Sequence, residues 1–399
     1  MWQYPTNLYL QDSIRHTAIR ILHKGFKAYI LHNKMTTLIL LILSFLLVIL
    51  IYIAKLWIKL YPYNHSPLKI HTFDNNDSPY HPSVLYFRNG WNGYKYWMAE
   101  TPFMPNTKPY RDRFECPSIH VSQDGIHWEE LAESNNPIDD LDEKGIKELD
   151  YFSDPHLVFK DNKIECWYRL TRRRGDAGNH KNHVIIRKTT NDGINWSERE
   201  IVIKPANKHP LGEMVISQAL LYIDGKYHIW YINSDNKQGR ELCYSNSFDG
   251  IKWTDHVKCT LQHRNENPWH IDINIIDNQI WLICYDFNNL HLYKGTDYTE
   301  FEYAKELLRP SVLGSFYHCG LYRSVLIKDE EYKLYFSADD SFKTYIGIMS
   351  GKSPMELSVI SPNDEEHSSI WNIIKLFAMW QKKRFDFYRK NILNKSRIR

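Results

Sequence analysis

Ionisable side chains stand at the start of several otherwise apolar segments of this sequence, and their types suit proton transfer and the binding of a polar ligand. An apolar strand needs no charge at its start, so the recurrence is more informative than any one residue. Two carboxyl groups on opposite sides of a bond can act as general acid and general base. The candidates for this chemistry are Glu115, Asp154 and Glu213, and those for ligand binding are His81, His156, Arg172, Gln218, His270, Asp272, Tyr317, His318 and Arg323. Each residue taken alone also fits a structural role, in which it satisfies backbone groups at a strand end.

A short phrase that recurs along the chain predicts the elements that position these residues. Its copies lie at 122–128, 190–196 and 247–253, and each contains Asp-Gly, then Ile, then Trp two residues later. Asp-Gly supplies the positive φ of a tight hairpin turn, and the Trp begins the next strand. Spacings of 68 and 57 residues between the copies indicate a repeated four-stranded unit.

Five such units fit between residues 81 and 361, although the phrase has decayed in the last two. Each opens with a short apolar strand and continues, after a turn, in an aromatic strand. The chain is therefore predicted to be all-β, with a five-bladed β-propeller over 81–361. A β-helix would need much shorter repeats. In a propeller the innermost strands begin at one face, so the residues that open the units should converge on one funnel. Together they would form a ring of carboxylates and cations suited to a polyhydroxylated ligand.

The blade pattern resembles the five-bladed propellers of glycoside hydrolase families 43 and 32. It is more similar still to uncharacterised propellers that carry the strings found here at 97–99 (Trp-Met-Ala), 117–119 (Pro-Ser-Ile) and 124–128 (Asp-Gly-x-x-Trp). The resemblance covers roughly residues 81–360, and its motifs specify the fold better than the reaction. It implies a glycoside hydrolase-like protein that binds carbohydrate.

The resemblance also implies roles for individual residues. Family 43 enzymes use a general base on blade one, an Asp that tunes the acid, and a Glu acid. Asp154 matches the blade-opening Asp-Pro string, and Glu213 lies just before the third innermost strand, where the acid could sit. Glu115 matches the Glu-Cys-Pro string that carries the family 32 acid/base, although here it precedes the Asp-Pro string. His81 stands where the family 43 base would be. We expect Glu115 and Asp154 to form the central pair, with Glu213 and Asp272 in reserve.

The electrostatics of such a pair follow from its surroundings. Burial among aromatic rings would raise the pKa of the acid, while Arg323 or Arg172 would keep its partner ionised. Arg172 begins a run of three arginines after the second strand of blade two. This run could lie over the funnel and select a carboxylated sugar, or it could be a solvated loop.

Charge is segregated along the chain, although its overall value is only +3. The first 60 residues carry seven Lys/Arg and one Asp, a net charge of +6, and residues 368–399 carry nine Lys/Arg and one Asp, a net charge of +8. Residues 61–367 therefore carry a net charge of −11. An acidic body argues against nucleic acid as a partner, because phosphate binding needs a basic face. Two basic ends suit contact with anionic lipid.

An apolar run over 38–54 predicts a transmembrane helix over 35–60, with a buried core helix or a cleaved signal peptide as the alternatives. A cytoplasmic amphipathic segment over 1–34 would precede it, and a linker over 61–80 would follow. The excess of Lys and Arg before the helix predicts a single-pass membrane protein with the propeller on the exported (periplasmic or extracellular) side. A basic amphipathic helix over 366–399 would lie on the membrane or pack against the propeller.

Two functions remain open from the sequence. The chain could be a membrane-anchored glycosidase that acts on an envelope or exopolysaccharide glycan, with a polysaccharide or lipid-linked glycan, the lipid bilayer and a membrane protein as partners. It could instead be a non-catalytic propeller that binds glycan or scaffolds a membrane assembly. Six cysteines are scattered singly, and no clustered His/Cys spacing indicates a metal, so we expect neither metal nor cofactor.

Overall fold

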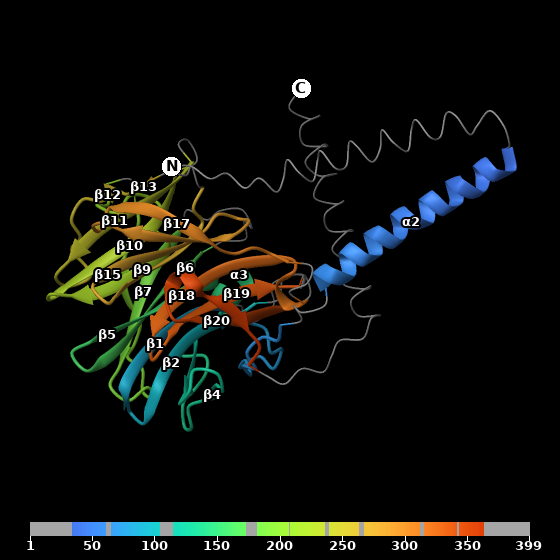
Figure 1. The fold of residues 1–399 in the computed structure, drawn as a ribbon. Coiled ribbons are helices and arrows are strands. Elements are labelled where there is room, and N and C mark those ends of the chain that lie inside the picture. Colours follow the sequence, from blue (N-terminus) through green and yellow to red (C-terminus); the bar gives the residue numbers. More distant parts are fainter. Residues whose placement is uncertain are drawn as a thin grey trace. The chain divides into compact units, whose positions relative to one another are not determined.

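The computed structural model describes residues 34–60, 65–103, 115–172, 182–206, 208–235, 239–262, 267–311, 315–340 and 343–362. The chain divides into two units, Met1–Tyr63 and Asn64–Arg399. In the described part of the second unit, five sheets form a ring, and each inner strand lies beside the inner strands of two neighbouring blades (Figure 1). The predicted all-β five-bladed propeller is therefore confirmed.

Each blade is an antiparallel sheet whose strands follow one another in chain order from the axis outward. Blade one is β1 (Pro79–Trp91), β2 (Tyr94–Pro102), β3 (Ser118–Ser122) and β4 (Glu129–Glu130). Blade two is β5 (Tyr151–Lys160), β6 (Lys163–Thr171), β7 (His183–Thr190) and β8 (Glu200–Ile203). Blade three is β9 (Ile216–Ile223), β10 (Lys226–Asp235), β11 (Gly239–Ser247) and β12 (Val257–Lys258). Blade four is β14 (His270–Ile276), β15 (Gln279–Tyr285), β16 (Leu290–Gly295) and β17 (Glu300–Leu308), with β13 (Thr260–Gln262) added in parallel to β17. Blade five is β18 (Gly320–Lys328), β19 (Tyr332–Asp339), β20 (Thr344–Gly351) and β21 (Ser358–Ile360). The short helices α3 (Glu143–Glu148), η1 (Ser315–Tyr317) and η2 (Pro354–Glu356) lie in connections.

The recurring phrase forms the same turn after the third strand of blades one, two and three. In blade one, the Ser122 hydroxyl accepts a hydrogen bond from the Gly125 amide at 2.9 Å, and Asp124 Oδ1 accepts from the amides of Ile126 and His127, each at 2.8 Å. Residues 190–195 and 247–252 repeat these bonds with nearly the same lengths. The Asp side chain therefore accepts hydrogen bonds from turn amides that have no backbone acceptor.

The glycine of this turn is required for packing as well as for its positive φ. A Cβ atom on Gly193, whose φ is +81°, would lie 2.2 Å from the Trp97 ring of blade one. A Cβ on Gly250 would lie 2.8 Å from the Trp167 ring of blade two. The turn of each of these blades thus seats the aromatic side chain of the preceding blade, so the phrase also sets the contact between blades.

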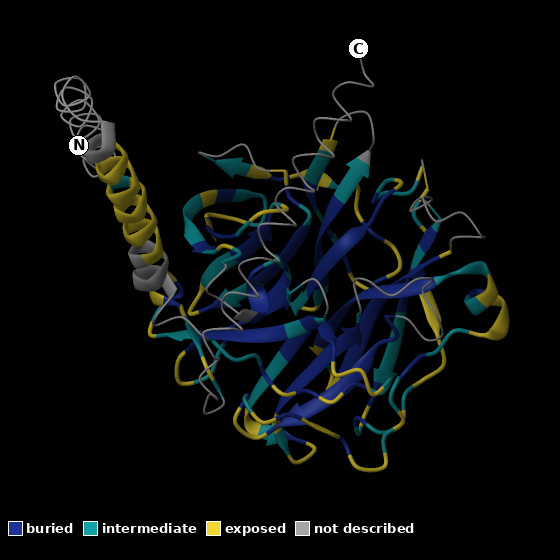
Figure 2. Cartoon of the chain, turned by 90° about the vertical axis from the view of Figure 1, so that its right-hand side faces the viewer, coloured by how far each residue is buried: buried dark blue, intermediate teal, exposed yellow. Residues whose placement is uncertain are grey.

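The core consists of apolar clusters that include side chains from adjacent blades, rather than one central core. The cluster that joins blades five and one closes the ring and contains Val84, Tyr335 and Ile348. Leu68 and Ile70, from the segment predicted as a linker, belong to the same cluster, and the Leu68 amide donates to the Ile346 carbonyl at 2.9 Å. Buried residues accordingly follow the strands, while exposed residues gather in the loops (Figure 2).

Three inner strands share a backbone irregularity where they open. His81, Asp154 and Ser217 have φ values of 52°, 54° and 52°, and each stands where the pairing with the second strand shifts register. Such a bulge bends a strand and turns the extra side chain in a new direction. Asp and His tolerate this left-handed conformation better than most residues. The bulges therefore turn selected side chains away from the regular alternation of the strand.

The first unit contains helix α2 (Lys34–Leu60), whose described side chains run from Leu38 to Ile53 and are mostly exposed and apolar. Among the described residues, no helix is both long enough and apolar enough to cross a membrane. The segments predicted as amphipathic, over 1–34 and 366–399, lie outside the described residues except for Lys34. Their structure stays a prediction.

Candidate active site

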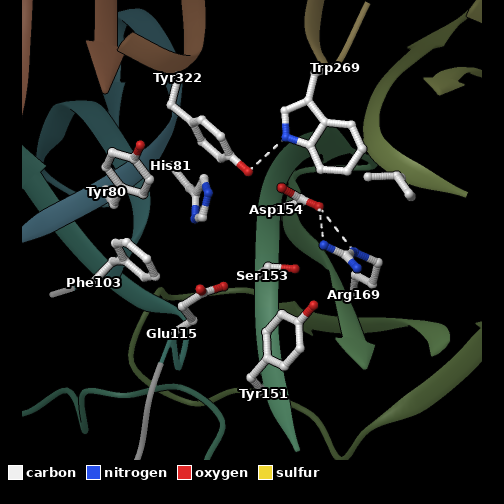
Figure 3. Close-up of a pocket in the computed structure, with 11 residues that line it drawn as sticks. Tyr80, His81, Phe103, Glu115, Tyr151, Ser153, Asp154, Arg169, Trp269 and Tyr322 are labelled. Atoms are coloured by element: carbon white, nitrogen blue, oxygen red, sulfur yellow. Dashed lines mark hydrogen bonds and ion pairs between the residues drawn. The ribbon is translucent and has the colours of Figure 1, made fainter. Parts of the chain in front are cut away.

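A cavity of about 210 Å³ lies where inner strands of the propeller begin. Its walls combine ionisable and aromatic side chains from blades one, two and five and from the segments between blades (Figure 3). The lining residues are Tyr80, His81, Phe103, Glu115, Tyr151, Ser153, Asp154, Arg169, Ile216, Trp269 and Tyr322. Pockets for drug-sized ligands generally exceed roughly 300 Å³, so this one suits a single small polar unit.

Asp154 is the electrostatic centre of the site. Its side chain is fully buried, and Arg169 donates from Nε to Oδ2 at 3.1 Å, with Nη2 at the same distance (Figure 3). Burial acts to raise the pKa of Asp154, but its neighbours, among which the charged Arg169 has the largest effect, outweigh burial and hold the pKa well below its usual range. Asp154 is therefore ionised at any working pH and cannot donate a proton.

His81 stands beside Asp154 as a neutral imidazole. Burial lowers the pKa of His81 to about 3, against an opposing effect of Asp154. Its Nδ1 lies 2.8 Å from the Thr101 hydroxyl, while its buried Nε2 has no hydrogen-bond partner among the described residues. A ligand hydroxyl or amide could supply that partner, since an unpaired buried polar atom is costly.

Glu115 approaches from the opposite wall, and its carboxylate points toward Ser153 and Asp154 (Figure 3). Its side chain is buried, and its backbone φ is 53°. A left-handed glutamate is uncommon and costs free energy, so it marks a place where the surrounding structure holds a side chain in a chosen direction. Glu115 and Asp154 thus face one cavity.

Aromatic rings form the remaining walls. Tyr80 stacks on Phe103 with ring centres 5.4 Å apart and on Tyr322 at 5.1 Å. The indole of Trp269 donates to the Tyr322 hydroxyl at 2.9 Å, which fixes both rings (Figure 3). Such rings offer flat apolar faces together with polar edges, a combination suited to the alternating C–H and hydroxyl surface of a sugar.

A second layer of polar side chains lies behind Asp154, inside the ring. The His156 Nε2–H donates to the Leu220 carbonyl at 2.8 Å, so its Nδ1 accepts from Arg323 Nη2 at 3.2 Å. Gln218 donates to the Asp154 carbonyl at 2.7 Å. His270 Nδ1 lies 3.0 Å from the Ser217 hydroxyl and 3.6 Å from Asp154 Oδ1. This layer positions Asp154.

The predicted site residues therefore separate into four groups. The cavity is lined by His81, Glu115 and Asp154, and the layer behind it contains His156, Gln218, His270 and Arg323. Asp272 is buried further along β14, where its carboxylate accepts from the Leu326 amide at 3.1 Å. The others do not line the cavity: Glu213 and Arg172 are exposed, His318 is buried elsewhere, and Tyr317 contacts His65.

Sequence reasoning missed Arg169, which is the nearest cation to Asp154. Of the two arginines expected to keep the carboxylate ionised, Arg323 lies 3.8 Å from Asp154, whereas Arg172 is exposed and does not line the cavity. Arg169 interrupts an aromatic strand, a signal of the kind that identified the strand-opening residues. It also missed the aromatic walls, which come from the starts of β1, β5 and β18 and from two connections, because the local pattern does not encode how these segments meet. Within the described residues, no group of three or more His, Cys, Asp or Glu side chains is arranged to hold a metal ion.

Comparison with known proteins supports the architecture. No family model matches the chain. A family 43 β-xylosidase/α-arabinofuranosidase from a compost metagenome, in complex with xylotriose, superposes with a TM-score of 0.54 at 13% identity, over 76% of this chain and 98% of that one. A GH43_1 enzyme from Xanthomonas citri, also bound to xylotriose, gives 0.53 at 11% identity, over 80% and 99%. The chain is a five-bladed propeller of the kind found in these glycoside hydrolases.

One relative is detectable by sequence as well. The A type blood N-acetyl-α-D-galactosamine deacetylase of Flavonifractor plautii is 25% identical over 301 residues, which cover 62% of this chain and 37% of that protein. The match thus spans little more than a third of the relative. The crystal structure of an N-acetylgalactosamine deacetylase from F. plautii, bound to blood group B trisaccharide, has a TM-score of 0.59 at 20% identity, over 74% of this chain and 93% of that one.

Proposed function

We propose that the chain is a glycan-acting hydrolase whose cavity holds one sugar residue. A single observation carries this proposal: Glu115 and Asp154 line one small, aromatic-walled cavity, and left-handed backbone holds both in place. Strained residues of this kind concentrate at functional sites. Carboxyl groups whose environments differ are the usual means of dividing acid and base roles.

In this proposal Asp154 acts as a fixed anion. Because Arg169 keeps it ionised, it can accept hydrogen bonds from sugar hydroxyls and stabilise positive charge that develops on the sugar ring. Glu115 is the proton-transfer group. In glycoside hydrolysis Glu115 first protonates the departing glycosidic oxygen and so becomes a carboxylate. A water then attacks the anomeric carbon and gives its proton to that carboxylate, which restores the acid.

The identity of His81 favours a second reaction, the removal of an N-acetyl group. His81 occupies the position of the family 43 base, and its pKa of about 3 makes it a weak proton acceptor. Amide hydrolysis needs only one proton-transfer group. Glu115 can take a proton from the attacking water and then deliver it to the departing amine. The F. plautii relative is named as a deacetylase, which supports testing this reaction beside glycoside hydrolysis.

The experiment screens oligosaccharides that contain N-acetylgalactosamine, and xylo-oligosaccharides, with two readouts. New reducing ends report cleavage of glycosidic bonds, and free acetate reports deacetylation. Glu115→Gln and Asp154→Asn should abolish whichever activity is found, and Glu198→Gln, a change at an exposed surface position, is the matched control. Binding without turnover would favour the alternative of a non-catalytic glycan-binding or scaffolding propeller. Turnover that persists in Glu115→Gln would refute the assigned role of Glu115.

We also propose, from the sequence, that the protein is tied to a membrane. The apolar run over 38–54 and the basic ends support single-pass anchoring with the propeller on the exported side, next to envelope or exopolysaccharide glycan. Alkaline extraction of membranes that contain the full chain, followed by protease treatment of intact cells, tests this proposal. Release of the protein by alkali, or protection of the propeller from external protease, would contradict it.

A further inference from the structure

We propose that the glycan carries a carboxylate on the sugar next to the one in the cavity, and that Arg240 recognises it. This inference rests on the proposed function, because it assigns a binding site for the adjoining sugar of the same glycan. Three features of the cavity margin lead to it: an arginine with no carboxylate partner among the described residues, the rings on which this arginine lies, and an exposed phenylalanine in a strained backbone.

Arg240 lies one ring away from the cavity. Its guanidinium carbon is 4.5 Å from the centre of the Trp269 ring and 4.3 Å from the centre of the Phe287 ring. The two rings stack on each other with centres 5.2 Å apart and an interplanar angle of 27°. Trp269 is itself a wall of the cavity (Figure 3). A ligand that leaves the cavity past Trp269 therefore meets Arg240 and Phe287 together.

The guanidinium of Arg240 lacks an anionic partner among the described side chains. No carboxylate there lies within ion-pair distance of it, and its buried Nε has no hydrogen-bond partner. Arg169, Arg187 and Arg199 each pair with a carboxylate. Burial lowers the pKa of Arg240 and outweighs an opposing effect of Tyr322, so the described residues do not fully offset the desolvation of this guanidinium. An arginine nonetheless stays charged.

Phe287 is an independent sign of ligand binding at the same place. Its side chain is 42% exposed, although it is held by stacking on Trp269. Its φ is 74°, a left-handed conformation that is a genuine outlier for a bulky residue. Exposed aromatic rings held in strained backbone are typical of binding surfaces. We infer that Phe287 supports the face of the adjoining sugar.

A carboxylate is the anion that this geometry fits. A planar guanidinium forms paired hydrogen bonds with a carboxylate, and stacking on two rings fixes the plane in which they are made. Residues 61–367 carry a net charge of −11, so an acidic glycan gains nothing from the overall field. Any preference for the acidic ligand must then come from a local cation, and at this margin that cation is Arg240.

The test compares uronic acid-containing oligosaccharides with the neutral counterparts made from them by carboxyl reduction. Affinities for both members of each pair are measured by titration calorimetry for the wild type, Arg240→Gln and Arg240→Lys, after circular dichroism confirms folding. The wild type should bind the acidic member roughly tenfold or more tightly, as expected for one charge-assisted pair. Arg240→Gln should bind both members equally. Arg240→Lys, which keeps the charge but lacks the planar fork, should keep a smaller preference.

The outcomes separate this inference from the proposed function. Equal wild-type affinity for the two members would overturn the role of Arg240 and leave the glycan-binding cavity standing. A preference that survives in Arg240→Gln would also overturn it. Failure of every oligosaccharide to bind would overturn both proposals. Phe287→Ala should weaken the binding of the acidic and the neutral oligosaccharide by a similar factor, because the proposed contact of the ring is with the face of the sugar and not with its carboxylate.

Discussion

Replacement of Arg169 by methionine tests whether the charge of Asp154 is balanced as the structure indicates. Arg169 Nε and Nη2 both lie 3.1 Å from Asp154 Oδ2, and the two side chains are 8% and 0% exposed. Methionine fills much of the same volume but leaves the carboxylate without its main partner. Removing one member of a buried ion pair costs about 3–5 kcal/mol. We expect the lower end of that range, because Arg323 Nη1 remains 3.8 Å from Asp154 Oδ1.

The double variant separates the free energy of the Arg169–Asp154 ion pair from the effect of the lost side-chain volume. Asp154→Asn alone leaves the buried Arg169 guanidinium without its carboxylate partner, although the Thr171 hydroxyl still accepts a hydrogen bond from Arg169 Nη1 at 2.9 Å. Arg169→Met combined with Asp154→Asn leaves neither member of this pair as an unpaired charge, and Arg323 loses its contact with the Asp154 carboxylate equally in the Asp154→Asn single variant and in the double variant. Its loss of unfolding free energy should therefore be smaller than the sum of the two single losses by about 1–3 kcal/mol, the usual coupling of residues in direct contact.

Urea unfolding followed by tryptophan fluorescence at pH 7 and pH 5 measures these values. In the wild type the lowered pKa of Asp154 contributes stability above the unfolded pKa of about 3.9, and this is lost only as pH falls toward the lower folded value. In Arg169→Met, burial acts with less opposition and raises that pKa. The variant should therefore recover stability relative to the wild type as the pH is lowered. Additive losses, with no such recovery, would refute the assigned pairing.

Two further predictions concern stability. Burial raises the pKa of Asp272 to about 6, above its ordinary 3.8, so the folded state binds this proton more tightly than the unfolded state does. The contribution of Asp272 to the free energy of unfolding should fall as pH rises through that interval. Asp272→Asn should therefore flatten the pH dependence of Tm between pH 4 and 7. An unchanged slope of Tm against pH would show that Asp272 is not the source of that dependence. Gly193→Ala should cost about 2–4 kcal/mol, because its Cβ would meet the Trp97 ring at 2.2 Å as well as require a φ of +81°. Gly225→Ala, at a φ of +76° with no atom within 4 Å, is the control and should cost only about 1 kcal/mol; equal losses in urea unfolding would eliminate the packing argument.

The propeller could be predicted from the sequence because its signal is local and repeated. Each Asp-Gly turn is specified by residues adjacent in the chain. Three intact copies, together with the strand pattern of two further units, gave the number of blades. The contact that the turn makes was not predictable. That Gly193 accommodates Trp97, almost a hundred residues earlier, depends on the packing of one blade against the next.

The candidate site was predictable where a residue breaks its own strand pattern, as His81 and Asp154 do. It was not predictable where segments distant in sequence meet. Arg169 reaches Asp154 across two paired strands, and Trp269 joins the cavity from the segment that precedes blade four. Exposed Glu213 was named from its place in the chain alone, and a carboxylate contributes to a cavity only if the local backbone turns it inward.

Blade three shows why the fold does not determine the reaction. The residue that opens its inner strand is Ser217, in the left-handed conformation that His81 and Asp154 also adopt. The Ser217 hydroxyl accepts a hydrogen bond from the Ile271 amide at 3.0 Å and contacts His270 Nδ1 at the same distance. It therefore links blade three to blade four and acts as a structural brace between them. The same backbone position therefore supplies an imidazole, a carboxylate or a brace, depending only on its side chain. Since blade one presents His81 and blade three a serine, the carboxylates that line the described cavity are Glu115 and Asp154. The proposed reaction therefore assigns the fixed anion to Asp154 and proton transfer to Glu115.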